Sequence, residues 1–417
     1  MAHLGLGAFH RAHQAWYTQA ANDAGDDAGI AAFTGRRPDA ARILAEQDAV
    51  YTLVTRSASG DSAAAIESLS RVHDGADDRA WHETLADPDV GVLTLTVTEA
   101  GYRPGGSAPG RVRSGLAARF RAGAGGLAVV SCDNLAGNGR VLREAVLAAG
   151  AADPETADPG LDDWIRSEVS FVSTMVDRIT PATTESDLTV VRRLAGWDDA
   201  APVIAEPFTE WVLAGDFPAG RPAWEAGGAR FVDDVEPFER RKLWLLNAGH
   251  SLLAYRGLLR GRTTIADAVA DPRLSEHLEQ LWAEQREDLP FSDEEVDAAL
   301  AALRDRFSNA RIEHRLIQVA TDGSQKLGPR IIDPLRARLG SGRPPGEAQL
   351  GVLAAWTLHL VSGDARDPAA EELAARLRDA RGPAERAALV LSSLAPDLAD
   401  LTDPLAERIA SLQGATV

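Results

Sequence analysis

The segment ERRKLWLLNAGHSLLAYRG, residues 239–257, places an amine, an amide, an imidazole and a carboxylate among Leu and Trp residues in one helical pattern. With Lys242 as zero, Glu239 lies at about 60°, His250 at about 80° and Asn247 at about 140° around an α-helix. Leu residues fall in the same arc, so the arc is not a simple solvent face. The pattern predicts a helix face that lines a partly dry pocket.

Lys242 is one of only two Lys residues in a chain that otherwise uses Arg for its positive charge. Apolar surroundings disfavour the charged amine and lower its pKa, so a Lys can take up a proton near neutral pH, whereas an Arg cannot. An Asn amide can donate to an oxygen that gains negative charge during hydride transfer. We therefore predict Lys242 as a general base, Asn247 as a donor to the reacting oxygen and His250 as an orienting group for a secondary alcohol.

Other dehydrogenase chemistries lack their residues in this chain. No Tyr is followed four residues later by Lys, and the single Cys, Cys132, does not suit a zinc site with several Cys ligands. His10 and His13 have i, i+3 spacing, but no third ligand is evident, so we expect no metal. Walker, GxSxG and HExxH motifs are also absent from the sequence.

The residues up to about 140 alternate between strand and helix patterns. Apolar runs at 29–35, 49–56, 90–102 and 126–134 predict strands, and intervening segments have helical periods. This alternation predicts a doubly wound parallel sheet, whose ligands bind at the carboxyl ends of the strands. Polar residues at those ends are therefore site candidates: Thr98, Glu99, Asp133 and Asn134.

From about residue 200 the pattern becomes mostly helical. Helices are expected at 236–258, 264–287, 293–306, 310–321, 347–361, 368–379 and 383–393. We therefore expect an α/β domain over residues 1–198 and a mainly helical substrate domain over residues 199–417, since a chain of 417 residues is too long for one core.

The turn GLGAFH indicates a dinucleotide site. Gly5 can make the tight turn, Gly7 allows a pyrophosphate to approach the backbone, and Ala8 and Phe9 open the following helix. His10 stands where the full motif has a third Gly. Only four residues precede Gly5, so we expect a stunted first strand.

The end of the second strand gives conflicting signals on the cofactor. Asp39 could bind the adenosine ribose of NAD, whereas Arg36 or Arg37 could accommodate the 2′-phosphate of NADP. The interpretation favours NAD through Asp39, with NADP possible.

Composition limits the partners. The net charge of -19 argues against nucleic acid and anionic membranes, and no apolar run is long enough to span a bilayer. One Cys and no visible signal peptide favour a reducing cytoplasm. The sequence leaves a monomer and a small homo-oligomer open.

Six segments carry a family resemblance: HLGLGAFHRAHQA at 3–15, TLTVTEAGY at 94–102, SCDNLAGNG at 131–139, STMVDRITPATT at 173–184, KLWLLNAGH at 242–250 and TDGSQKL at 321–327. In this order the chain resembles the mannitol dehydrogenase family, the polyol-specific long-chain dehydrogenases/reductases. The resemblance implies a Rossmann-like N-terminal domain, a helical C-terminal domain and metal-independent, NAD(P)-dependent oxidation of a secondary alcohol.

The resemblance also implies roles for single residues. Lys242 matches the general base, and Asn247 is one half of a pair that stabilises the oxyanion. Asn138 is the preferred second half, with Asn134 as the alternative. The carboxylates expected along a proton path from the Lys to solvent are Asp177 and Glu239.

The segment 312–339 is similar to the sugar-acid branch of the family, fructuronate reductase or mannonate oxidoreductase. A sugar acid needs a cation for its carboxylate, ideally a bidentate Arg. Lys326 is the first candidate, followed by Arg330 and Arg315. A mannitol 2-dehydrogenase, another polyol dehydrogenase and a non-catalytic relative with an impaired cofactor site stay open as alternatives.

Overall fold

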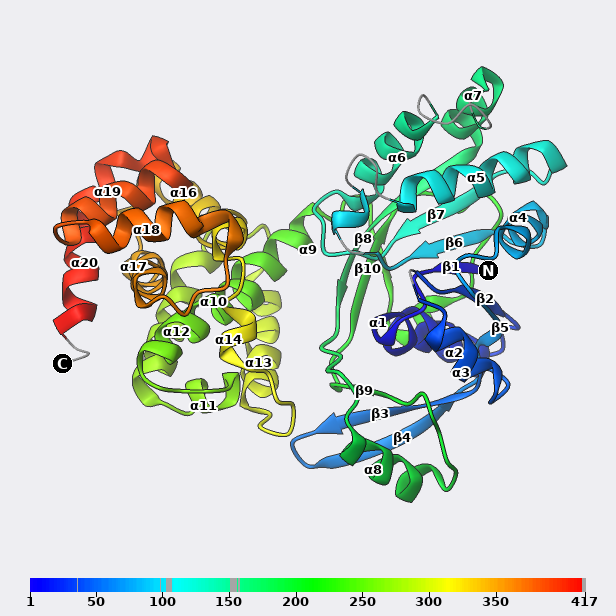
Figure 1. The fold of residues 1–417 in the computed structure, drawn as a ribbon, viewed down its shortest axis with the longest axis horizontal. Coiled ribbons are helices and arrows are strands. Elements are labelled where there is room, and N and C mark those ends of the chain that lie inside the picture. Colours follow the sequence, from blue (N-terminus) through cyan, green and yellow to red (C-terminus); the bar gives the residue numbers. More distant parts are fainter. Residues whose placement is uncertain (36, 98, 103–106, 151–155, 157, 415–417) are drawn as a thin grey trace. The chain divides into compact units, whose positions relative to one another are not determined.

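The computed structural model describes residues 1–35, 37–97, 99–102, 107–150, 156 and 158–414. The chain divides into two compact units, Met1–Phe238 and Glu239–Val417 (Figure 1). This division lies later than the expected boundary at 198/199, because strands from the segment after residue 199 pair with strands of the first unit. No helix in the described part of the chain is long and apolar enough to cross a membrane.

The first unit contains a sheet of eight strands in the order β11-β10-β8-β7-β6-β1-β2-β5. The strands are β1 (Ala2–Leu4), β2 (Ile30–Phe33), β5 (Leu69–His73), β6 (Val92–Leu95), β7 (Leu127–Ser131), β8 (Val169–Asp177), β10 (Glu210–Ala214) and β11 (Arg230–Phe231). The six strands from β8 to β5 are parallel, whereas β10 is antiparallel to β8. The chain runs outward from β1 on one side and from β6 on the other, so the topological switch point lies between β1 and β6.

Helices cover both faces of this sheet, as the doubly wound prediction requires (Figure 1). Leu93 and Leu95 of β6 pack with α4 to α7, and Val92 packs on the opposite face with α2 and η2, because alternate strand residues point to opposite faces. The helices of the first unit are α1 (Ala8–Ala12), α2 (Gln14–Asp23), α3 (Asp39–Ala45), α4 (Asp78–Ala86), η1 (Glu99–Tyr102), α5 (Ser107–Ala122), α6 (Asn138–Ala149), α7 (Pro159–Glu168), α8 (Glu185–Ala195) and η2 (Trp224–Gly227).

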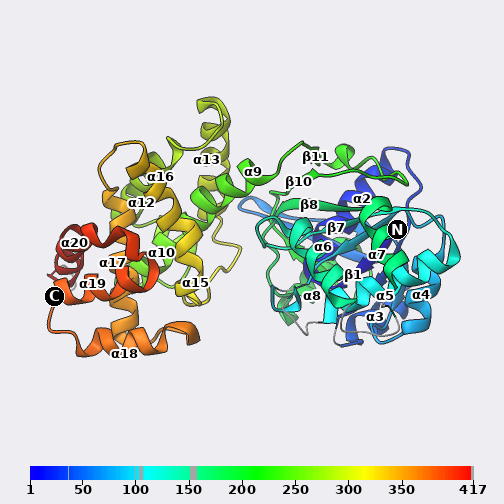
Figure 2. The same ribbon diagram turned by 90° about the horizontal axis from the view of Figure 1, so that it is seen from above.

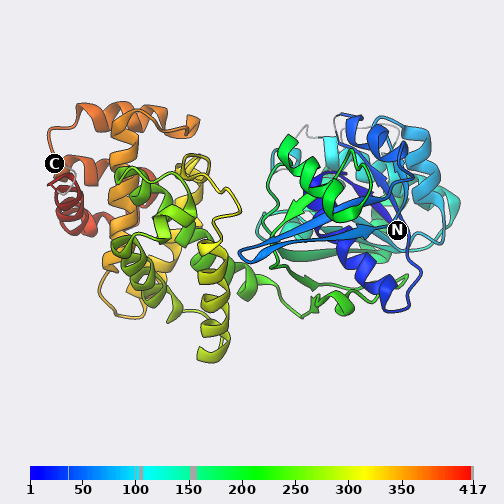
Figure 3. The same ribbon diagram turned by 90° about the horizontal axis from the view of Figure 1, so that it is seen from below.

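Strand β1 is short, as expected, yet it is central. Its three residues are fully or almost fully buried and pair with β2 on one side and β6 on the other. The run at 49–56 also forms a strand, β3 (Tyr51–Ser57), but outside the main sheet. It pairs with β4 (Gly60–Ile66) and β9 (Val203–Ala205) in a sheet of three strands, and the β3–β4 hairpin is the long blue arm of Figure 3.

The second unit is helical, as predicted. Its elements are α9 (Glu236–Arg241, which begins in the first unit), η3 (Lys242–Asn247), α10 (Ala248–Leu259), α11 (Ile265–Val269), α12 (Pro272–Arg286), α13 (Asp293–Ser308), α14 (Leu316–Val319), α15 (Gly323–Leu327), η4 (Gly328–Ile332), α16 (Asp333–Gly340), α17 (Glu347–Ser362), η5 (Pro368–Ala370), α18 (Glu371–Asp379), α19 (Pro383–Leu394), η6 (Pro396–Leu401) and α20 (Thr402–Gly414). Helix α17 is almost entirely buried, and Figure 2 shows it among α10, α18, α19 and α20.

Two expected helices of the second unit differ from the structure. The period at 264–287 is divided between α11 and α12, where Asp271 caps the new helix and Pro272 begins it. The period at 310–321 gives only the single turn α14, because Arg315 instead forms a β-bridge with Thr264.

Candidate active site

The predicted helix at 236–258 exists, but its centre is not an α-helix. Residues Lys242–Asn247 form the π-helix η3 between α9 and α10, and the N–H of Ala248 donates to the carbonyl of Leu243, five residues earlier. Such i→i+5 segments are rare and frequent at functional sites. Residues five apart then lie about one turn apart, so Asn247 is closer to the Lys242 face than the α-helical wheel predicts.

The apolar residues at the centre of this segment are buried. Trp244, Leu245 and Leu246 are buried, while Lys242 and Asn247 are half-buried. The indole of Trp282 donates to the Leu245 carbonyl over 2.9 Å, which fixes the π-helix against α12. Glu239, half-buried on α9, lies one turn before Lys242.

His250 is 7% exposed and packs between two rings of the second unit. The Phe307 ring lies 4.7 Å from its centroid and the His314 ring lies 4.8 Å away, nearly perpendicular. Burial lowers the pKa of His250 well below its usual value, and neighbouring positive groups, among them Arg330 and Lys242, lower it further. The ring is therefore neutral, and its buried Nε2 has no hydrogen-bond partner among the described residues.

One of the three predicted substrate cations lies beside this helix. Arg330, in the second π-helix η4, directs Nη1 to the Asn247 carbonyl at 3.4 Å and to the Ser251 hydroxyl at 3.2 Å. The Ser251 hydroxyl in turn donates to the same Asn247 carbonyl over 3.1 Å. The arrangement fixes a guanidinium at the junction of η3 and α10.

The other two cations are placed differently. Lys326, the first candidate from sequence, donates through Nζ to the carbonyl and the hydroxyl of Thr321 at 2.7 and 3.2 Å. Arg315 is exposed and forms an ion pair with Glu313 at 2.7 Å. The residue that sequence reasoning missed is His314, next to Arg315, whose ring contacts His250. Its only signal was a His in the Arg-rich segment.

The predicted cofactor turn lies at the switch point of the sheet. Gly5 has φ of +111°, and a Cβ on it would lie 2.2 Å from the Thr96 carbonyl oxygen at the end of β6, so only Gly fits. The Thr96 hydroxyl donates to the Gly5 carbonyl over 2.8 Å. Gly7 precedes the first residue of α1, and Gly7, Ala8 and Phe9 are half-buried.

The residue in place of the third Gly is part of the core. His10 is completely buried and stacks on His3 with 3.3 Å between ring centroids. Burial lowers the pKa of His10 well below its usual value, so this ring is neutral. His13 stacks on Phe9 at 5.0 Å, and its Nε2 lies 3.1 Å from the Glu210 carbonyl oxygen. Both rings therefore contribute packing, as the sequence interpretation favoured.

The amide of Asn138, the preferred second oxyanion donor, is bound to the backbone. Its Nδ2 donates to the carbonyls of Asp133 and Thr174, each over 2.9 Å, and its Oδ1 accepts from the Thr174 N–H over 2.9 Å. Both amide hydrogens are thus used to join the end of β7 to β8. Asn134, the alternative, is exposed directly after β7. In this arrangement the Asn138 amide has no hydrogen left for a ligand.

Asp133, between β7 and Asn134, holds the segment that follows β6. It accepts a hydrogen bond from the Val97 N–H over 2.7 Å and another from the Tyr102 hydroxyl. Burial raises the pKa of Asp133 to about 7. Thr98 lies outside the described residues, as does the side chain of Glu99, so the two predicted site residues of this segment have no described geometry.

The remaining predicted residues lie at the edges of the first unit. Asp177 is the last residue of β8, is 8% exposed and lies opposite Glu210 of β10. Asp39 is the first residue of α3, where it is exposed and forms an i, i+3 ion pair with Arg42 at 3.8 Å. Arg36 lies outside the described residues. The cofactor preference therefore gains no support from either side chain.

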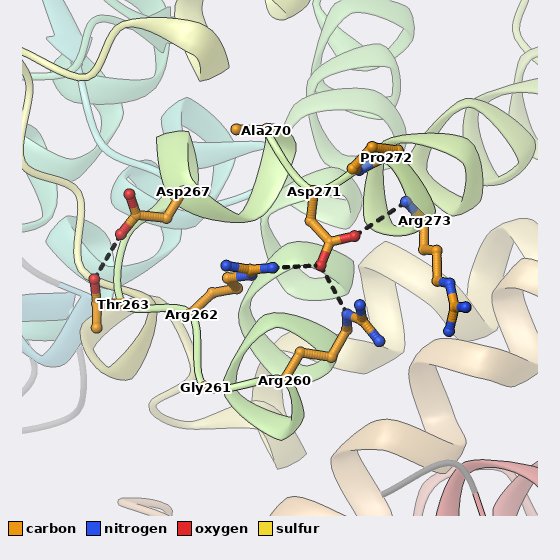
Figure 4. A pocket seen from close by; sticks show the side chains of 9 residues that line it. All are labelled: Arg260, Gly261, Arg262, Thr263, Asp267, Ala270, Asp271, Pro272 and Arg273. Carbon is orange, nitrogen blue, oxygen red and sulfur yellow. Dashed lines mark hydrogen bonds and ion pairs between the residues drawn. The ribbon is translucent and has the colours of Figure 1, made fainter.

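A pocket of about 740 Å³ in the second unit contains none of the predicted residues (Figure 4). Arg260 and Arg262 both bind the buried carboxylate of Asp271 there, at 2.9 Å each. The residues that line this pocket come after the end of α10 in the sequence. Asn247 and His250 instead lie at the start of that helix.

Comparison with known proteins supports the fold and shows the family of this chain. D-mannonate oxidoreductase of Escherichia coli K12 is 37% identical over 388 residues, covering 85% of this chain and 79% of that protein. Mannitol 2-dehydrogenase of Aspergillus fumigatus is 34% identical, covering 91% of this chain and 83% of that protein. The structure of Pseudomonas fluorescens mannitol 2-dehydrogenase in complex with NAD and D-mannitol matches with a TM-score of 0.82 at 32% identity, covering 100% of this chain and 92% of that one.

Two family models match consecutive parts of the chain. The mannitol dehydrogenase Rossmann domain matches residues 1–226, and the mannitol dehydrogenase C-terminal domain matches residues 234–409. The chain belongs to the mannitol dehydrogenase family.

Proposed function

We propose that this chain is a nicotinamide-dependent oxidoreductase that interconverts a secondary alcohol and a ketone on a linear sugar acid, of the D-mannonate and D-fructuronate type, without a metal. The observation that carries the proposal is the arrangement on η3 and α10. A neutral buried His250, the amine of Lys242 and the guanidinium of Arg330 belong to one cluster beside Asn247. That set supplies a proton acceptor, hydrogen-bond donors and a cation for a carboxylate.

The first unit fits a nicotinamide cofactor. Gly5 closes the β1–α1 turn at the switch point, and Gly7 leaves the backbone before α1 open to a pyrophosphate. In the similar Pseudomonas fluorescens enzyme the bound cofactor is NAD. When bound, such a cofactor would supply the acceptor for the hydride that leaves the carbinol carbon as the alcohol is oxidised. NAD is the preferred form, with NADP as the alternative.

Residues of the second unit accept the proton of the substrate hydroxyl and return it in the reverse direction. The O–H bond of the substrate breaks as its C=O bond forms, and the proton passes to Nζ of Lys242. The side-chain amide of Asn247 donates to the oxygen while it carries negative charge, and the neutral His250 orients the hydroxyl before transfer. In the reverse direction protonated Lys242 returns the proton to the oxygen.

Three further side chains take supporting roles in this proposal. Asn134 replaces Asn138 as the second oxyanion donor, because the Asn138 amide has no hydrogen left to donate. Asp177 and Glu239 serve as carboxylates on the path by which the proton leaves Lys242.

Arg330 is the cation that favours a sugar acid over a neutral polyol. A guanidinium can bind a carboxylate through two parallel hydrogen bonds. Arg315 is already paired with Glu313, and Lys326 is bound to Thr321. The second candidate function is that of a mannitol 2-dehydrogenase, which the similarity to the Aspergillus fumigatus and Pseudomonas fluorescens enzymes supports.

The purified chain should be assayed with D-fructuronate and with D-fructose, each with NADH and with NADPH. We expect kcat/KM to be at least about tenfold higher for fructuronate, which corresponds to about 1.4 kcal/mol of transition-state binding. Arg330→Gln should abolish this preference, whereas the matched variant Arg315→Gln should keep it. A preference for fructose in the unaltered chain would contradict the sugar-acid assignment.

A non-catalytic relative is tested by cofactor binding alone. With 9 Trp residues in the chain, NADH binding can be followed by energy transfer from Trp to the nicotinamide. We expect saturable binding of at least one of NADH and NADPH. If neither binds, the oxidoreductase proposal fails.

A further inference from the structure

A second pocket in the helical unit is rich in positive charge. Its volume is about 330 Å³, and it lies between α10, α12, α17 and α20. The polar groups that line it are Arg256, His277, Gln280, Glu347, Arg408 and Ser411. None of them belongs to the proposed catalytic or substrate-binding set.

Arg256 is a half-buried guanidinium that no carboxylate of the described residues binds. Its hydrogen-bond contact is with the Nε2 of His277, at 3.4 Å from its Nη2. Burial, together with the nearby guanidiniums of Arg260 and Arg408, lowers the pKa of Arg256 to about 10. A half-buried charge without a bound counter-charge is costly, so an anion at this site would stabilise Arg256.

In the neighbouring pocket of about 740 Å³, by contrast, a carboxylate of the protein binds the guanidiniums (Figure 4). There Asp271, which is 3% exposed, binds both Arg260 and Arg262. These hydrogen bonds lower the pKa of the Asp271 carboxyl. The protein thus supplies its own carboxylate to Arg260, one helical turn after Arg256, but supplies none to Arg256 itself.

The other polar groups of the smaller pocket are mostly donors. If the Nε2 of His277 accepts from Arg256, its Nδ1 carries the hydrogen, and this buried Nδ1 has no partner among the described residues. Arg408 is half-exposed and forms an ion pair with Glu347, so part of its guanidinium faces the pocket. With one carboxylate and two guanidiniums, the pocket keeps a net positive charge in a chain whose net charge is -19.

We propose that this pocket is a binding site for a small oxyanion, either inorganic phosphate or a metabolite with a phosphate or carboxylate group. Arg256 and Arg408 donate to its oxygens in the paired geometry that a guanidinium offers. The pocket volume lies at the small end of the range for ligand sites, about 300–1,000 Å³, and suits a compact ligand. The site is separate from the proposed reaction and does not depend on it.

The test uses the whole chain without substrate or cofactor. Thermal unfolding and titration calorimetry are run with sodium phosphate, with succinate and with sodium chloride at one ionic strength. We expect phosphate to raise Tm above the chloride value, and we expect Arg256→Gln to weaken phosphate binding at least tenfold. A response to succinate instead of phosphate would assign the site to carboxylate ligands.

The controls separate specific binding from general charge effects. Arg378→Gln removes an exposed Arg of α18 and should leave the response to phosphate unchanged. Arg256→Gln should unfold in chloride at the same temperature as the unaltered chain or higher, because it removes an uncompensated charge. If that variant does not fold, Arg408→Gln, whose altered side chain is half-exposed, carries the same expectation. Equal responses in the unaltered chain and Arg408→Gln, or no response beyond chloride, would overturn the proposal.

Discussion

Asn138 of the first unit and His250 of the second unit are both buried polar residues in sequence motifs of the family, but they use their hydrogen bonds differently. The Asn138 amide makes three hydrogen bonds to the backbone and joins β7 to β8. His250 is held by ring contacts, and its Nε2 has no partner among the described residues. A buried polar atom without a partner needs an explanation, and a ligand is one. The difference indicates that Asn138 supports the fold, whereas His250 has bonding capacity for a substrate.

The largest expected effect is a loss of turnover on substitution of Lys242 in the second unit. Lys242→Ala should lower kcat by about 10²–10⁴ at pH 7, the range for loss of a general base, with the Kd for NADH unchanged. Lys242→Arg should be equally inactive, because a guanidinium keeps its proton. The measurement is steady-state turnover together with NADH binding, with Lys326→Ala as the matched control. An unchanged rate would remove Lys242 from the mechanism.

Variants of Asn138 and Asn134 separate a structural role from a catalytic role within the first unit. Asn138→Ala should lower the free energy of unfolding by about 2–4 kcal/mol, because three hydrogen bonds are lost and backbone groups stay buried without partners. Asn134→Ala, at an exposed position, should lower kcat with a smaller loss of stability than Asn138→Ala. Urea unfolding and turnover measurements on both variants test which Asn supports the fold and which one acts in the reaction. Loss of turnover at full stability in Asn138→Ala would reverse the assignment.

The next largest effect is expected for His250, and the pH dependence of kcat/KM tests it. Its pKa lies well below the usual value of a His, so ionisation of His250 should not appear in kcat/KM between pH 6 and 7.5. His250→Ala should lower kcat/KM by about tenfold to hundredfold, since a positioned hydrogen bond to the substrate is lost. A pH profile of both proteins tests this. An inflection near pH 6.5 that disappears in His250→Ala would show that the ring is charged in the working enzyme.

The last prediction concerns the pH dependence of stability that arises from Asp133, which holds the segment after β6. Its pKa is about 7 in the folded protein and about 3.9 in the unfolded chain, so the folded state binds more protons between these values. Its contribution to stability therefore falls as pH rises from about 4 to 7, by at most about 1.4 kcal/mol per pH unit, and is constant above pH 7. Asp133→Asn should lack this slope when unfolding is measured from pH 4.5 to 8. A parallel slope in both proteins would contradict the buried carboxyl.

The sequence by itself determined the family, the doubly wound plan of the first unit, with helices on both faces of a parallel sheet, and the helical second unit. Gly5 could be identified because a GxG turn after a strand indicates a dinucleotide site, and the structure gives it a φ of +111° that favours Gly. The strands β2, β6 and β7 followed from buried β-branched and apolar runs, which have a local pattern. Lys242, Asn247 and His250 were found because their polar types interrupt a local apolar helix.

Contacts between distant segments decided the rest, and no local pattern contains them. The π-helix of η3 shifts Asn247 toward Lys242, a change that a calculation with α-helical geometry cannot show. Pairing of β9 with β3 and of β10 with β8 places the residues after 199 in the first unit. The choice of Arg330 over Lys326 and the use of the Asn138 amide by Thr174 depend on which side chains and backbone groups meet in space. Hydrogen bonds between residues far apart in sequence are a property of the folded chain, and for this reason only the tertiary structure decided which groups these polar residues contact.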